Sequence, residues 1–156
     1  MSIRRRAAAL GAVSLGLIAL SACEKPTPLV TVTVGGDTVT TEAADNCYAD
    51  GDKLTEKAFL ACLDGTPKKT LTVHTGDKVR IGVDPSISDK GWVVATGTSG
   101  KSGLLKGVTY RSIDAETLFS DSQTGQTADE VTLNVIETAG TQEYLGVWQF
   151  KLKMAD

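Results

Sequence analysis

The sequence predicts an immunoglobulin-like antiparallel β-sandwich with one short helix. Three observations favour this fold class. About seven or eight short segments alternate apolar with polar residues, which is typical of half-buried strands. Turn residues separate these segments. A single segment places its apolar residues at helical spacing instead. We see no internal repeat, so we expect one domain over residues 29–156.

Residues 28–41 predict the first pair of strands, a hairpin. Valine alternates with threonine along this stretch. Gly35 and Gly36 supply the positive φ angles that a two-residue hairpin turn requires. This turn places Val32 opposite Val39, so apolar side chains meet on one face of the pair.

Residues 52–65 predict the single helix, because their apolar residues recur at helical spacing. Asp52 is expected to cap the start of this helix and Gly65 its end.

Two strands with apolar alternation flank the turn at 75–77. A three-residue turn there would place Val73 opposite Val79 and Leu71 opposite Ile81. Apolar residues would again face apolar residues, so this segment predicts a second hairpin.

The remainder of the chain predicts further strands with turn signals between them. The last strand has Trp148, Phe150 and Leu152 on one face and polar residues on the other. Strands are expected over 91–97, 108–113, 130–137 and 143–154, with a glycine-rich loop at 98–107 and a helical turn at 114–120.

The first 28 residues predict export and a lipid anchor. Three arginines precede a short apolar run, which is typical of a signal peptide over residues 1–22. The run ends in Leu20-Ser21-Ala22-Cys23, which resembles a bacterial lipobox. Cys23 would carry the lipid, residues 23–28 would form a short tether, and the domain would sit on the extracytoplasmic face of the membrane. The alternative is a secreted protein cut nearby, and both Sec and twin-arginine export stay open.

The chain has three cysteines, of which Cys23 belongs to the lipobox-like motif and the other two are Cys47 and Cys62. With Cys23 lipidated, Cys47 and Cys62 remain, and outside the cytoplasm they are expected to form a disulfide. The rival interpretation is a metal or redox dithiol, which the wide spacing of the two cysteines disfavours.

Cleavage would also change the charge. The chain has 16 basic residues, and losing the three signal arginines leaves 13 against 19 acidic residues, a net charge of −6. Such a chain is not expected to bind nucleic acid or to bind an anionic lipid surface by charge.

No stretch of the sequence predicts catalysis, a metal or a cofactor. His74 is the only histidine, it is expected on the outward face of a strand, and no nucleophile lies in an elbow motif. In the acidic stretch 45–52, Cys47 and Ala49 occupy positions where an EF-hand needs oxygen ligands. Asp50-Gly51-Asp52 therefore predicts a turn and a helix cap.

Leu104 and Leu105 are adjacent leucines within the glycine-rich loop. Exposed on a loop, they would form a contact patch for a partner protein. In the alternative, which we prefer, one or both pack into the core beneath the loop.

The chain as a whole resembles a family of small lipoproteins from high-GC Gram-positive bacteria. The resemblance rests on LSACEKPTPLVTVTVG at the start, the Cys47–Cys62 pair, VDPSISDKGW and the final GVWQFKLK. It implies the location and the fold, and no established activity comes with it. The expected function is a non-catalytic binding or structural module of the cell envelope, with an envelope or secreted protein as partner.

A second resemblance gives the alternative function. The order of strands and turns over Leu71–Ala95 is similar to that of chagasin-type inhibitors of cysteine proteases. The inhibitory Asn-Pro-Thr-Thr-Gly loop of that family is absent, and residues 85–90 stand in its place. Its Arg-Pro-Trp motif is missing too, and Val147-Trp148 matches only the tryptophan. An enzyme is the lowest-ranked function.

Overall fold

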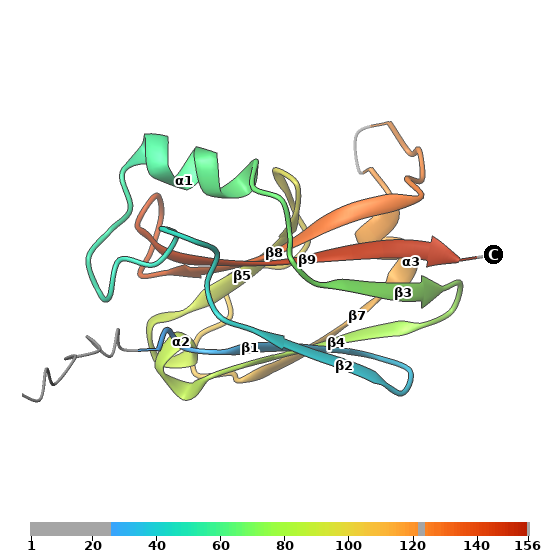
Figure 1. Ribbon diagram of the computed structural model, residues 1–156, viewed down its shortest axis with the longest axis horizontal. Coiled ribbons are helices and arrows are strands. Elements are labelled where there is room, and N and C mark those ends of the chain that lie inside the picture. Colours follow the sequence, from blue (N-terminus) through green and yellow to red (C-terminus); the bar gives the residue numbers. More distant parts are fainter. Residues whose placement is uncertain (1–25, 122–123, 156) are drawn as a thin grey trace, which may run out of the picture.

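The computed structural model describes residues 26–121 and 124–155. The predicted signal peptide, residues 1–22, and the predicted lipidation residue Cys23 lie outside these ranges. Two sheets pack face to face as a β-sandwich, which confirms the predicted fold class (Figure 1). The smaller sheet has four strands in the order β2-β1-β4-β7, and the larger has five in the order β3-β9-β8-β5-β6.

The strands lie close to where the sequence predicts them. The smaller sheet consists of β1 (Val30–Val34), β2 (Asp37–Thr41), β4 (Lys78–Val83) and β7 (Tyr110–Asp114). The larger sheet consists of β3 (Thr70–His74), β5 (Trp92–Thr96), β6 (Ser99–Gly100), β8 (Glu130–Thr138) and β9 (Tyr144–Ala155).

The predicted first hairpin is confirmed in its register. Val32 pairs with Val39 across β1 and β2, and the tight turn between the strands contains Gly35 with a φ of 55°. Because that turn fixes the register, the valines of β1 all point into the sandwich and its threonines point outward.

The predicted second hairpin is wrong, although both of its strands exist. β3 pairs in parallel with β9, with Leu71 beside Leu152, whereas β4 lies in the other sheet between β1 and β7. The turn between β3 and β4 therefore carries the chain from one sheet to the other. The apolar faces of the two strands meet across the core, which satisfies the same alternation as a hairpin would.

Three helices are present among the described residues, where one was predicted. They are α1 (Glu56–Leu63), α2 (Pro85–Lys90) and α3 (Ala115–Phe119). α1 lies over the outer face of the larger sheet, and α2 and α3 lie at opposite ends of the sandwich (Figure 1). α3 matches the predicted helical turn. α2 was expected as a loop, but Pro85 at its first position has the φ angle that begins a helix.

The predicted N-cap of α1 is also wrong. Thr55, not Asp52, caps the helix: its Oγ1 accepts a hydrogen bond from the amide of Ala58 at 3.2 Å. Asp52 lies earlier, in a turn closed by its own amide on the carbonyl of Ala49. Gly65 follows the last residues of α1, close to the predicted end.

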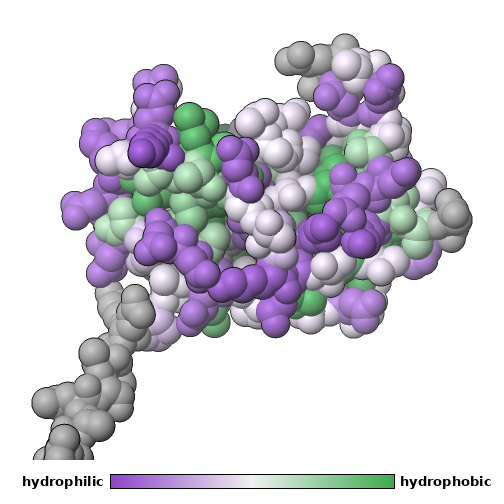
Figure 2. Space-filling view, turned by 45° about the horizontal axis from the view of Figure 1, so that its top comes forward, coloured by the Kyte–Doolittle hydropathy of each residue, from purple (hydrophilic) through white to green (hydrophobic). Residues whose placement is uncertain are grey.

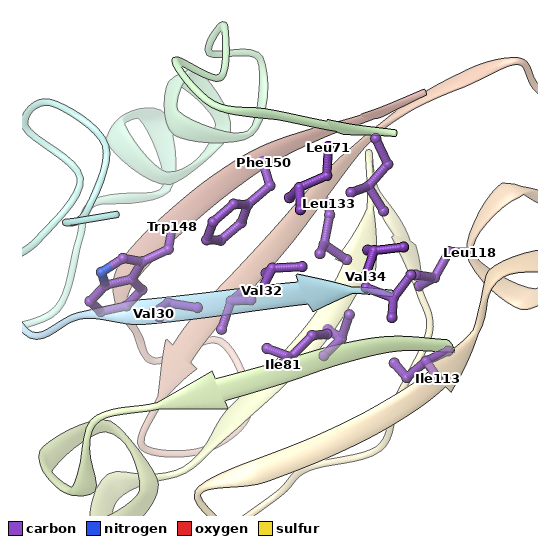
Figure 3. Close-up of a cluster of buried hydrophobic side chains, with 14 of the residues drawn as sticks. Val30, Val32, Val34, Leu71, Ile81, Ile113, Leu118, Leu133, Trp148 and Phe150 are labelled. Carbon is purple, nitrogen blue, oxygen red and sulfur yellow. The ribbon is translucent and has the colours of Figure 1, made fainter. Parts of the chain in front are cut away.

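The main core fills the space between the sheets (Figure 3). Trp148, Phe150 and Leu152 of β9 all point into it, as the alternation predicts, and each is fully buried. Burying a side chain of this kind stabilises the fold by about 1.5–3 kcal/mol. Other fully buried members are Val30, Val32, Ile81, Trp92, Val94, Leu133 and Val135.

A second, smaller core lies on the outer face of the larger sheet, beneath α1. Its buried members are Cys47, Phe59, Cys62, Ala95, Ile136 and Val147. The predicted disulfide between Cys47 and Cys62 is confirmed, with the two Cα atoms 5.8 Å apart. The ring of Phe59 stacks on that of Tyr144 with 3.7 Å between centroids.

None of the helices formed by residues 26–121 and 124–155 is both long and apolar enough to cross a membrane.

Candidate functional site

An apolar cleft lies between α1 and the β5–β6 hairpin. It encloses about 360 Å³. We call it the α1 cleft and define it by the side chains that make it apolar: Phe59, Leu60, Leu63, Val93, Ile136 and Tyr144. This volume is near the lower end of the range for small-molecule sites, which suits one large apolar side chain.

The cleft exists because α1 covers only part of the apolar strip on the larger sheet. Phe59 and Cys62 point down into the second core, whereas Leu60 stands at the rim with 49% of its surface exposed. On the opposite side the hairpin contributes Gly97 and Gly100. A Cβ atom at either glycine would meet nothing within 4 Å, so that side of the cleft stays open.

Two polar side chains at or near the α1 cleft have partners within the fold. The hydroxyl of Ser102 accepts a hydrogen bond from the amide of Val94 at 2.8 Å. The ammonium of Lys101 donates to the carbonyl of Ser120 at 2.6 Å. Hydrophobic side chains gather beside α1 with hydrophilic ones around them (Figure 2). This arrangement fits an uncharged apolar group.

The predicted contact loop reaches the cleft, but not through its leucines. Thr98, Gly100 and Ser102 line the α1 cleft. Leu105 packs against the main core and forms a bridge with Trp92, so it follows the preferred alternative. Leu104 lies outside the cleft with 55% of its surface exposed, as the contact hypothesis requires.

His74 and the acidic stretch 45–52 form no site. His74 is exposed, and its Nδ1 lies 3.5 Å from a carboxylate oxygen of Asp77. Asp45 forms an ion pair with Lys68 at 2.8 Å. The predicted turn at Asp50-Gly51 is confirmed, with both residues at positive φ. Within the described ranges, no group of three or more His, Cys, Asp or Glu side chains could hold a metal ion.

The sequence reasoning missed Glu137, the buried carboxylate of β8. Its side chain is fully buried, and neither oxygen has a hydrogen-bond partner among the described residues. The ammonium of Lys90 lies 3.6 Å away, at the end of α2. The sequence does contain a sign that Glu137 is buried. Leu133, Val135 and Glu137 fall on the same face of β8, and that face is the apolar one.

Burial determines the direction in which the pKa of Glu137 is shifted. It raises the pKa of the Glu137 carboxyl above its ordinary value, and the attraction of Lys90 offsets this only in part. The pKa of Tyr48 is raised as well, first by burial and then by the charges of Glu137 and Asp50. Because no surface of Glu137 is exposed, the carboxylate cannot reach a substrate in this structure, and its effect is on stability.

The two segments that stand where chagasin-type inhibitors have their inhibitory motifs are not arranged as exposed loops. Residues 85–90 form α2, in which Ile87 is fully buried. Trp148 is fully buried too, and its indole N–H donates to the carbonyl of Pro28 at 2.8 Å. Neither segment presents a ring or loop that could enter a protease cleft.

In comparisons with known proteins, no family model, no curated protein and no solved structure matches this chain.

Proposed function

We propose that this protein is a lipid-anchored, extracytoplasmic binding module of the cell envelope, and that the α1 cleft is its binding site. In this proposal the cleft takes up an apolar side chain of a partner protein. The observation that carries the proposal is an open apolar cleft, with a half-exposed leucine at its rim, on a stably folded sandwich.

Two features support the extracytoplasmic location. The motif Leu20-Ser21-Ala22-Cys23 follows a signal-like apolar run. The Cys47–Cys62 disulfide belongs to the oxidising side of a membrane, because cytosolic thiols are kept reduced.

The geometry of the cleft favours binding over catalysis. Its lining is mostly apolar, and the hydroxyl of Ser102 in that lining is already hydrogen-bonded to the amide of Val94. The half-exposed Leu60 beside the cleft would lose contact with water when a partner covers it, which favours binding.

The test is to capture a partner with the full chain from solubilised native envelopes and to compare three forms. Wild type and Leu104→Asp should retain the same specific protein, since Leu104 lies outside the cleft. Leu60→Asp should weaken its binding about thirtyfold, because it removes an apolar contact and places a charge in an apolar interface. Because both leucines are about half exposed, neither change should unfold the domain.

Two results would overturn the assignment to the cleft: retention of the partner by Leu60→Asp, or its loss with Leu104→Asp alone. Inhibition of a papain-like protease at micromolar concentration would replace the proposal with the inhibitor function.

A further inference from the structure

Exposed hydrophobic side chains concentrate at one end of the sandwich. Among the described residues the large exposed ones are Leu29, Leu60, Leu104, Val108 and Tyr110. Leu60 belongs to the α1 cleft. The backbone of Leu29 bonds with Asp84, the residue before α2, and Leu104 and Val108 belong to a loop whose Gly107 bonds to Ser88 of α2. Tyr110 is the first residue of β7 and pairs with Gly82 of β4, two residues before Asp84.

We call residues 104–111 the α2-flanking segment. The amide of Gly107 donates to the carbonyl of Ser88 in α2 at 2.8 Å, and the carbonyl of Thr109 accepts from the amide of Val83 at 2.9 Å. These two hydrogen bonds hold the backbone of the segment against α2 and β4. The side chains of Leu104, Val108 and Tyr110 are 55%, 40% and 52% exposed.

The same segment carries cations. Lys106 and Arg111 are exposed, and neither forms an ion pair or hydrogen bond with another described residue. Apolar and aromatic side chains interleaved with lysine and arginine are the composition that binds the interface of a bilayer.

The opposite flank of α2 has the opposite charge. A groove there contains the carboxylates of Glu42, Asp50 and Asp84. The net charge of −6 for the mature chain is therefore unevenly distributed. Near an anionic surface, the acidic flank would be repelled and the α2-flanking segment attracted.

The tether brings this end of the molecule to the membrane. Pro26 lies in the acidic groove beside Ser86 of α2. Cys23 precedes it by three residues, which span at most about 11 Å. α2 itself is only about 9 Å long, so both of its flanks lie close to the point where the tether begins.

We propose that the α2-flanking segment rests on the surface of an anionic lipid bilayer and so fixes the orientation of the domain. This inference rests on the proposed lipid anchor at Cys23. The anchor holds α2 near the membrane, Leu104, Val108 and Tyr110 enter the interface, and Lys106 and Arg111 pair with lipid phosphates. The α1 cleft, on the outer face of the larger sheet, then remains open to a partner.

The reactivity of lysines tests this contact. The full lipidated protein is bound to vesicles of phosphatidylcholine alone or with phosphatidylglycerol, and exposed lysines are acetylated and read by mass spectrometry. The ratio of Lys106 to Lys57 modification should fall about fivefold in the anionic vesicles, the effect of one cation near such a surface. Lys57 of α1 serves as the reference in the same molecule.

A variant that leaves Lys106 unchanged makes the test specific. Leu104→Ser with Arg111→Glu should abolish the protection of Lys106. Lys69→Glu reverses the charge of an exposed side chain away from α2, as Arg111→Glu does beside it, and should retain the protection.

The two proposals fail differently. Protein that does not float with either vesicle would lack its anchor, and the inference falls with the anchor. Protein that floats while Lys106 reacts as fast in anionic as in neutral vesicles would keep the anchor and overturn the membrane contact. Protection that survives Leu104→Ser with Arg111→Glu would also overturn it.

Discussion

Glu137 places a negative charge inside the sandwich, where water cannot solvate it. Gly146 lies opposite it on β9, and the six-membered ring of Trp148 covers that glycine, since a Cβ there would lie 2.8 Å from the ring. Lys90 is the basic group that faces Glu137. Tyr48 lies near enough that, after burial, the charge of Glu137 contributes to the raised pKa of Tyr48. Burial outweighs the pull of Lys90, which is why the pKa of the carboxyl is raised.

This raised pKa predicts how stability depends on pH. The folded state holds the proton of Glu137 at pH values where the unfolded state has released it. The free energy of unfolding therefore falls as the pH rises from about 4.5 through the higher pKa of the folded state. Glu137→Gln removes the charge, so it should be more stable than wild type at pH 7, and the difference should vanish below pH 4.5. Urea unfolding at both pH values measures this.

Glu143→Gln is the matched control, because Glu143 is half exposed and pairs with Lys53 on the surface. It should change stability little at either pH. A gain in Glu137→Gln that is the same at pH 4 and pH 7 would contradict the electrostatic explanation.

Among the elements, α1 depends most on a covalent link. It is eight residues long, which is too short to be stable alone in water. Its capping Thr55, its buried Phe59 and the disulfide hold it on the larger sheet. The α1 cleft has one wall on this helix, so the geometry of the cleft depends on the same link.

Loss of the disulfide is therefore expected to affect α1 more than the sandwich. Replacing Cys47 and Cys62 with alanine should lower the free energy of unfolding by about 3 kcal/mol, the chain-entropy value for a loop of this length. Amide hydrogen exchange should speed up first in α1, while the strands of the main core stay protected. Equal acceleration in α1 and β9 would contradict this separation of the two cores.

At the scale of the whole molecule, α2 and the α1 cleft lie on different surfaces. α2 and the described N-terminal residues share one end, and α1 covers the outer face of the larger sheet (Figure 1). A lipid on Cys23 would bring the end that contains α2 toward the membrane and leave the face covered by α1 accessible.

The proposed anchor predicts a change of location when Cys23 is replaced. Cys23→Ala removes the only thiol that the lipobox motif offers for lipidation, so the chain should move from the membrane fraction to the soluble extracytoplasmic fraction. Fractionation, with mass spectrometry of the N-terminal peptide, measures both the location and the lipid. An unchanged distribution, or a wild-type peptide without lipid, would contradict the anchor.

The sequence by itself determined the fold class, the positions of most strands and the register of the first hairpin. These features depend on local information. Period-two alternation identifies a half-buried strand, and a two-residue glycine turn allows one register for Val32 and Val39. The disulfide was also predictable, because the expected lipidation of Cys23 leaves Cys47 and Cys62 as a pair.

Only the tertiary structure decided which strands pair and where the sites lie. The alternation of Leu71 and Val73 is equally satisfied by a hairpin with β4 and by packing across the core from it. β9, about eighty residues further along the chain, takes β3 into the larger sheet. The α1 cleft and the charged flanks of α2 likewise combine residues distant in sequence. No local pattern encodes such contacts, because burial and pairing are properties of the assembled sheets.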